Sequence, residues 1–236
     1  MSGLMNERES ILARVREALT NAAPLPGHHD HDDRPAHPSP RAAATGARDW
    51  LPPVGPTFDD HVALFRANAA ELKADFHWLD SPAALAPLLR QLRDAEGWKR
   101  AASHAGQLTD AACQALGLPV LRADETYDVN ELEACDVGIT ECDALVAQTG
   151  SVLVTSRSAG GRALSVLPPH HVVIARGEQL LADLPAAFQL LQRKYSDNYP
   201  SFISFITGPS RTGDIERILV LGAHGPKRLT IVCIQP

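Results

Sequence analysis

From Thr57 onward, apolar residues at helical spacing alternate with short apolar runs typical of strands. Helical spacing is found in three segments, residues 58–75, 83–95 and 108–116, and again in a shorter one, residues 129–134. The segments between them predict strands at residues 76–79, 99–103, 119–122 and 137–140. This alternation is the pattern of an α/β domain and limits the chain to few architectures.

The second half of the domain departs from simple alternation. ALVAQTGSVLVTS predicts two strands that meet at residues 149–151, which makes a hairpin and not a crossover. HHVVIA predicts a buried strand, followed by a helix over residues 182–194 and a last strand over residues 229–234. We therefore predict a three-layer α/β/α fold with a mostly parallel, mixed sheet, helices on both faces and an antiparallel hairpin insertion.

Two segments of different composition precede this domain of residues 57–236. Residues 1–19 place Ile11, Leu12, Val15 and Leu19 at helical spacing, which predicts an amphipathic helix. It could dock on a protein partner, fold back, or pair with a second copy. Residues 20–56 are rich in Pro, His and Ala and predict a flexible linker. Its HHDHDD tract lacks surrounding structure, so we do not expect a selective metal site there.

Charge, hydropathy and cysteine spacing exclude several classes of protein. The formal charge is −6 and the basic residues are scattered, which argues against nucleic acid binding. No apolar run approaches the roughly 18 residues of a membrane span, and the N-terminus lacks a signal-peptide core, so we expect a cytoplasmic protein. A cytosolic compartment argues against disulfides, and the four cysteines form no C-x-x-C pair, which argues against a zinc site or a cluster held by this chain alone.

The segment FISFITGPSRTGDIERILVLGAHGP, residues 202–226, predicts a strand, a small-residue turn, a short acidic helix and a second strand. A helix that follows such a turn presents unpaired backbone N–H groups at the end of the sheet, where anions bind. Hydroxyls and a guanidinium could supplement these amides, and Asp214 adds an acid–base group. The candidate anion-binding residues are Gly208, Ser210, Arg211 and Thr212. Alternatively, Thr212 caps the helix and the acids complement its dipole.

Four other turns carry further candidates. Glu141 and Asp143 flank Cys142 just after a strand, where they could contact a ligand, although capping and hairpin stabilisation explain them as well. Thr149, Gly150 and Ser151 could contact a ligand or simply form a tight hairpin. His224 precedes Gly225 in the GAHGP turn and is the best candidate to exchange a proton near neutral pH. Alternatively, its ring only fixes the turn. His170 and His171, next to Pro169, are interpreted as strand-entry residues in preference to ligand contacts.

The signatures of common cofactors are missing from the sequence. There is no G-x-x-x-x-G-K-[ST] loop, no usable G-x-G-x-x-G and no G-x-S-x-G elbow. ATP, NAD and serine-hydrolase chemistry are therefore not indicated. Several of the candidate turns end a predicted strand, and ligands of open α/β sheets sit outside the carboxyl ends of the strands, so we expect the site at that edge.

Three segments in order, GITECDALVAQTGSVLV, LSVLPPHHVVIA and ISFITGPSRTGDIERILVLGAHGPKRLTIVCI, closely resemble the lactate utilisation protein C branch of the lactate-utilisation (LUD) domain family. In the family's hallmark segment, here GPSRTGDIE, Gly213 replaces a more usual Ala. The resemblance implies an α/β/α fold related to ribose-phosphate isomerases and coenzyme A transferases. It also implies a three-protein system that oxidises L-lactate to pyruvate, with iron–sulfur clusters on the other subunits.

The resemblance leaves the mechanism open. Lactate oxidation needs an electron acceptor, and this sequence shows neither cluster ligands nor a dinucleotide loop, so we infer a subunit that binds a ligand or assists assembly. Two alternatives belong to other classes. One is an autonomous enzyme acting on coenzyme A esters or sugar phosphates, with Glu141 or Glu216 as nucleophile. The other is a purely structural assembly factor.

Overall fold

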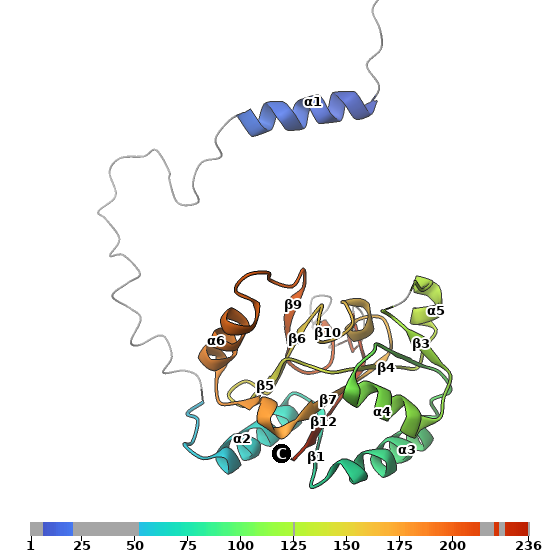
Figure 1. The fold of residues 1–236 in the computed structure, drawn as a ribbon, viewed down its shortest axis with the longest axis vertical. Coiled ribbons are helices and arrows are strands. Elements are labelled where there is room, and N and C mark those ends of the chain that lie inside the picture. Colours follow the sequence, from blue (N-terminus) through green and yellow to red (C-terminus); the bar gives the residue numbers. More distant parts are fainter. Residues whose placement is uncertain (1–6, 21–51, 125, 213–219, 222–224, 236) are drawn as a thin grey trace, which may run out of the picture. The chain divides into compact units, whose positions relative to one another are not determined.

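The computed structural model describes residues 7–20, 52–124, 126–212, 220–221 and 225–235 (Figure 1). The chain divides into two units, residues 1–49 and residues 50–236. In the first unit, the predicted amphipathic helix is present as α1 (Glu7–Thr20). Most of the predicted linker lies outside the described residues. The second unit carries all the elements that follow.

A six-stranded sheet forms the centre of the second unit. Its neighbouring strands pair in parallel throughout, as expected for strands with near-continuous apolar runs such as VVIA and LTIVCI. The strand order is β1 (Asp75–Leu79), β12 (Arg228–Ile234), β7 (His170–Arg176), β4 (Val137–Thr140), β2 (Ala101–Ser103) and β3 (Val120–Arg122). The α/β fold predicted from the alternation of helices and strands is confirmed.

The predicted hairpin is confirmed as the antiparallel pair β5 (Ala144–Val146) and β6 (Ser151–Thr155). It belongs to a second, four-stranded mixed sheet beside the six-stranded parallel one. The order of this sheet is β8 (Leu180–Leu181), β5, β6 and β9 (Ile203–Ile206). β5 and β6 are buried along their whole length because both faces of the small sheet are covered.

Helices and the second sheet cover the two faces of the large sheet. On one face, α3 (Leu85–Glu96) and α4 (Gln107–Leu116) lie side by side and pack on the large sheet (Figure 1). On the other face, α2 (Phe58–Glu71) and the small sheet share one apolar cluster with β7 and β12. α6 (Leu184–Tyr195) packs on the outer face of the small sheet, and α5 (Val129–Glu133) contributes to a further cluster with β2.

Local sequence sets where these helices begin and end. Thr57 and Asp60 form a capping box at the start of α2, in which the Thr57 hydroxyl accepts from Asp60 N at 3.1 Å and the Asp60 carboxylate accepts from Thr57 N at 3.0 Å. Gly97 ends α3 with a φ of 68°, which a glycine adopts without strain. Among the described residues, the domain also has 3₁₀ turns at Pro82–Ala84, Ala163–Ser165 and Gly177–Gln179.

Gly138 in β4 gives a first prediction, on stability. A Cβ at this position would lie 2.4 Å from the carbonyl oxygen of Leu164, a backbone atom that cannot move aside. We expect Gly138→Ala to lower the free energy of unfolding by about 2 kcal/mol, measured by urea denaturation. Gly117→Ala is the control, because its Cβ meets nothing within 4 Å and only its φ of 63° opposes the change. An equal loss in both variants would contradict the steric explanation.

Candidate functional site

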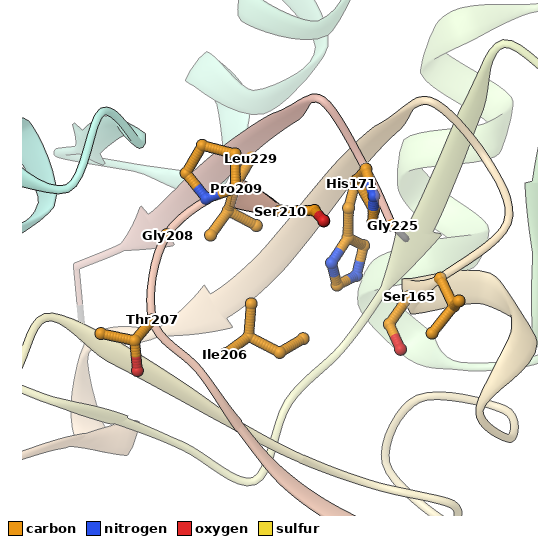
Figure 2. A pocket seen from close by; sticks show the side chains of 11 residues that line it. Ser165, His171, Ile206, Thr207, Gly208, Pro209, Ser210, Gly225 and Leu229 are labelled. Carbon is orange, nitrogen blue, oxygen red and sulfur yellow. The ribbon is translucent and has the colours of Figure 1, made fainter. Parts of the chain in front are cut away.

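A pocket of about 190 Å³ lies between the two sheets, at the amino ends of β7 and β12 and the carboxyl end of β9 (Figure 2). Segments from four parts of the chain line it. These are Ser165 and Val166, His171, Ile206 to Ser210, and Gly225 with Pro226 and Leu229. The pocket therefore assembles three of the sequence motifs, LPPHHVV, ITGPS and HGP, at one place.

His171 contributes a buried, neutral imidazole to this pocket. Its side chain is 1% exposed, and its Nε2 lies 2.8 Å from Thr140 Oγ1 on the neighbouring strand. Nδ1 has no hydrogen-bond partner among the residues that the structure describes. Burial, and then the charge of the adjacent His170, lowers the His171 pKa to about 3, so the ring is neutral near pH 7. Figure 2 shows the ring directed into the pocket between Ser210 and Ser165.

Two turns build the opposite wall of the pocket and are tied to each other. Ser210 N donates to the Pro226 carbonyl at 2.9 Å, so the GPS and HGP segments are held side by side. Gly208 has a φ of 85°, which requires glycine. A Cβ on Gly225 would lie 3.2 Å from Ser210 Cβ, so Gly225 leaves room for the serine side chain. The predicted site residues Gly208, Ser210 and Gly225 are thus brought together.

Arg211 lines a neighbouring hollow on the other side of this segment. It belongs to β10 (Arg211–Thr212), which pairs with β11 (Val220–Leu221), so its side chain alternates in direction with that of Ser210. The hollow has a volume of about 290 Å³ and also contains Thr149 and Gln148, whose buried Oε1 lacks a partner among the described residues. Glu71 lines the same hollow.

The hairpin residues Thr149, Gly150 and Ser151 support the pocket from behind. Ser151 Oγ donates to Thr149 Oγ1 at 2.8 Å and lies 2.8 Å from Thr207 Oγ1, a residue of the pocket wall. Gly150 has a φ of 64° and faces α2 so closely that a Cβ would lie 2.8 Å from Asn68 Cβ. The tight packing of the hairpin accounts for Gly150, and the hydroxyl chain through Ser151 positions Thr207.

Glu141 lies at the opposite edge of the large sheet, at the carboxyl end of β4. Its Oε1 accepts from Leu108 N at 2.8 Å and Thr109 N at 3.4 Å, so the carboxylate caps the start of α4. The capping interpretation left open by the sequence therefore has a direct structural basis.

Asp143 is also remote from the pocket and is engaged in a buried ion pair. Its side chain is fully buried and accepts from Lys194 Nζ at 2.6 Å, Tyr195 OH at 2.7 Å and Thr155 Oγ1 at 2.8 Å. Burial opposes ionisation, but these hydrogen bonds outweigh it and lower the Asp143 pKa. Thr155, which bonds to Asp143, is four residues from Ser151 along β6. This spacing places it about 13 Å from the hairpin residue that lies behind the pocket.

Three of the predicted site residues cannot be placed. Asp214, His224 and the side chain of Thr212 lie outside the described residues. The helix predicted after the GPSRT turn falls on residues 213–219, which are likewise outside them. The structure does show that Arg211 and Thr212 are strand residues, so the turn is followed by β10 and not directly by a helix.

The pocket does not lie at the edge of the sheet where the sequence places the site. The pocket lies at the amino ends of β7 and β12, whereas the carboxyl end of β4 is occupied by the Glu141 cap. Prolines and glycines before β7 and β12 turn the chain over the amino edge and leave the space there. His171, which lines the pocket, was interpreted from the sequence as a strand-entry residue. The strand alternation in HHVVIA, which sends the two histidines to opposite faces, was the signal for it.

The described residues do not fit a metal or an iron–sulfur cluster. No group of three His, Cys, Asp or Glu side chains among them is placed to hold a metal ion. Of the four free cysteines, Cys142 and Cys233 share one apolar cluster, and Cys113 and Cys135 lie in two others. Burial raises the pKa of Cys142 well above its ordinary value and that of Cys233 to about 12, which keeps both thiols protonated and unreactive.

Glu141 gives a second prediction, which separates capping from chemistry. Glu141→Ala removes the carboxylate that accepts from the first amides of α4, so we expect the free energy of unfolding to fall by about 1 kcal/mol. Glu133→Ala, an exposed change on α5, should stay within about 0.5 kcal/mol of the unmodified protein. Denaturation of both variants checks this. A stability unchanged by Glu141→Ala would contradict the capping role.

Together, the two sheets and the pocket define an α/β protein with a small pocket lined by glycine-containing turns and a buried histidine. A search of known protein families identifies the particular class. The LUD domain model matches residues 62–234, so the chain belongs to the LUD domain family. No helix in the described part of the chain is long and apolar enough to cross a membrane.

Similar proteins carry the name lactate utilization protein C. The chain is 34% identical to lactate utilization protein C 1 of Bacillus mycoides over 114 residues, 48% of this chain and 49% of that protein. Identity to the Shouchella clausii protein is 36% over 113 residues, again 48% and 49%. These matches span about half the length of the relatives. A Bacillus velezensis relative aligns over 100% of this chain and 98% of its own length at 24% identity.

A solved structure supports the fold. The crystal structure of a DUF162 family protein from Deinococcus radiodurans superposes with a TM-score of 0.61 at 20% sequence identity. The match covers 76% of this chain and 99% of the solved chain. At this identity, the likeness shows the shared fold alone.

Proposed function

We propose that this chain is a non-redox component of a multi-subunit system that oxidises L-lactate to pyruvate, in which partner subunits hold the iron–sulfur clusters. Membership of the LUD domain family and the relatives named lactate utilization protein C support this proposal. The buried His171 pocket is the single observation that favours ligand binding over a purely structural role in assembly.

The cysteines support the division of labour in this system. Oxidation of lactate releases two electrons and two protons, and an acceptor must take up the electrons. The four cysteines are buried in three different apolar clusters, so they do not form a common ligand set for a cluster. This arrangement supports placing the clusters on partner subunits. Four free thiols also favour the reducing cytoplasm as the compartment.

The geometry weakens the alternative of an autonomous coenzyme A or sugar-phosphate enzyme. Such a transferase needs a nucleophilic glutamate beside its ligand, and Glu141 instead caps α4 at the far edge of the sheet. Glu216, the other candidate nucleophile, lies outside the described residues. Mass spectrometry after incubation with acyl donors tests this alternative. A covalent mass increase that disappears in Glu141→Gln would revive it.

Anaerobic affinity purification of the tagged chain from its own cells, grown on L-lactate, tests the proposed function. We expect cysteine-rich iron–sulfur subunits to co-purify and the eluate to oxidise L-lactate with an artificial electron acceptor. Recovery of this chain alone after crosslinking, with the partner subunits shown to be expressed, would overturn the proposal.

Arg211→Ala separates ligand binding from assembly within that complex. We expect the variant to co-purify with its partners and to oxidise lactate at least about tenfold more slowly, because a charge-assisted contact is lost. Arg193→Ala, an exposed arginine on α6, is the control. Unchanged oxidation by the Arg211→Ala complex would leave only the assembly role.

A further inference from the structure

His170 and His171 form a tandem pair whose rings lie on opposite faces of the large sheet. Each ring bonds through Nε2 to a threonine of the adjacent strand at 2.8 Å, His170 to Thr230 and His171 to Thr140. Each Nδ1 is buried without a partner among the described residues. His171 faces the pocket described above, whereas His170 lines a separate hollow beside Trp98. His171 thus faces the pocket with an Nδ1 that has no partner among the described residues, and His170 provides a natural comparison.

The His171 Nδ1 is a hydrogen-bonding group that calls for a partner. A buried polar atom without a partner costs about 1–3 kcal/mol, and most such atoms in native proteins are satisfied by protein, water or ligand. The nearby polar groups of the described lining are hydroxyls, of which Ser210 comes from the GPS turn and is not bonded to the described residues through its side chain. Figure 2 shows both side chains directed into the same space.

The remaining lining defines the shape and charge of what fits. Ile206, Leu229 and Val166 provide apolar walls. None of the described lining residues carries a formal charge near pH 7, since the His171 ring is neutral. A doubly charged phosphate would therefore lose its hydration without a compensating charge. The volume of about 190 Å³ is below the roughly 300–1,000 Å³ of drug-sized sites, which restricts the ligand to a few heavy atoms.

The positive charge of Arg211 lies just behind the pocket wall. A Cβ on Gly208 would lie 2.9 Å from Arg211 Nη2, so the guanidinium packs against the glycine that lines the pocket. A ligand with one negative group could place that group on the Gly208 side, toward Arg211, and its uncharged part against His171. The arrangement suits a monoanion with one further polar oxygen and a short alkyl end.

We propose that this pocket binds a short-chain 2-hydroxy or 2-oxo carboxylic acid. Its hydroxyl or carbonyl oxygen bonds to His171 Nδ1 and Ser210 Oγ, its alkyl end contacts Ile206 and Leu229, and its carboxylate lies on the Gly208 side. A carbonyl needs the tautomer with Nδ1–H, whereas a hydroxyl can bond to either tautomer. The inference deepens the proposed function and rests on it for the choice of L-lactate and pyruvate as probes.

Two substitutions of His171 separate a ligand contact from a structural role. The amide of glutamine reaches the position of Nε2, so His171→Gln keeps the bond to Thr140 and loses the polar atom in the pocket. The shorter amide of asparagine occupies the position of Nδ1, so His171→Asn does the reverse. His170→Gln on the opposite face is the matched control, because its ring has the same pattern of contacts but lines the other hollow.

Titration of the purified full chain with L-lactate, pyruvate and inorganic phosphate, followed by ligand-observed NMR, tests the inference. We expect L-lactate and pyruvate to bind and phosphate not to bind. His171→Gln should weaken binding at least about tenfold, and His171→Asn and His170→Gln less than about threefold. Thermal melts confirm that each variant is folded.

Three outcomes would overturn the inference. These are tighter binding of phosphate than of L-lactate, equal loss in His171→Gln and His170→Gln, or no binding of either acid by the folded protein. Co-purification with iron–sulfur subunits is a separate measurement, so the proposed function stands if only binding fails. If the chain binds the acids but no partner subunits co-purify with it, the proposed function is contradicted and the inferred binding pocket is supported.

Discussion

Lowering the pH from about 7 to about 5 is expected to reduce the free energy of unfolding by about 4 kcal/mol, well before the carboxylates titrate. The cause is the tandem histidine pair. Burial, with the positive charge of Arg228, lowers the His170 pKa to about 4, and burial lowers that of His171 to about 3. Both groups have pKa values near 6.5 in the unfolded chain.

The sign follows from proton uptake. Below about pH 6.5 the unfolded chain takes up protons on these histidines and the folded protein does not, so acid favours unfolding. The stability that depends on the two neutral histidines is fully present above about pH 6.5. It is lost as the pH falls toward 4, by about 1.4 kcal/mol per pH unit for each histidine. Glu96 and Asp75 favour the charged form of His170 but do not outweigh burial.

Urea denaturation at a series of pH values measures this effect. His170→Gln and His171→Gln should each remove about half of the slope between about pH 6.5 and 5, and the double variant most of it. A double variant that keeps the full slope would assign acid sensitivity to other groups.

The sequence predicted the elements well where periodicity was strong. The residues predicted for β4, 137–140, are those observed, and the helix predicted over residues 108–116 differs from α4 by one residue. The division into two sheets was not predictable from these patterns. Strands such as β5 and β6 are buried on both faces, so their apolar runs do not reveal which strands pair with them.

The candidate site was only partly predictable for a related reason. Small residues and turn motifs identified Gly208, Ser210 and Gly225, which do line the pocket, and the same reasoning selected Glu141 and Asp143, which lie elsewhere. A turn signal marks the end of a strand but does not say which edge of the sheet that end reaches. That information comes from pairing between segments distant in the sequence, such as β7 with β12.

Lys194→Met is expected to lower the free energy of unfolding by about 3 kcal/mol, because it leaves the Asp143 carboxylate buried without its cation. The estimate is at the low end for a broken buried pair, since Lys194 itself is 49% exposed and the hydroxyls of Tyr195 and Thr155 still donate to Asp143. Arg193→Met, the exposed neighbour on α6, should change stability by less than about 0.5 kcal/mol. Urea denaturation near pH 7.5 compares the two.

The pH dependence of that loss distinguishes a charge effect from lost packing of the lysine stem. In the unmodified protein the lowered Asp143 pKa contributes stability that is present above the unfolded value of about 3.8 and disappears as the pH falls below it. In Lys194→Met, burial no longer opposed by the ammonium raises the Asp143 pKa, so the folded variant takes up a proton first. The difference in free energy of unfolding between the two proteins should therefore narrow from neutral pH toward about pH 4.5. If the difference stays constant, the methylene groups of Lys194, and not its charge, stabilise this end of α6.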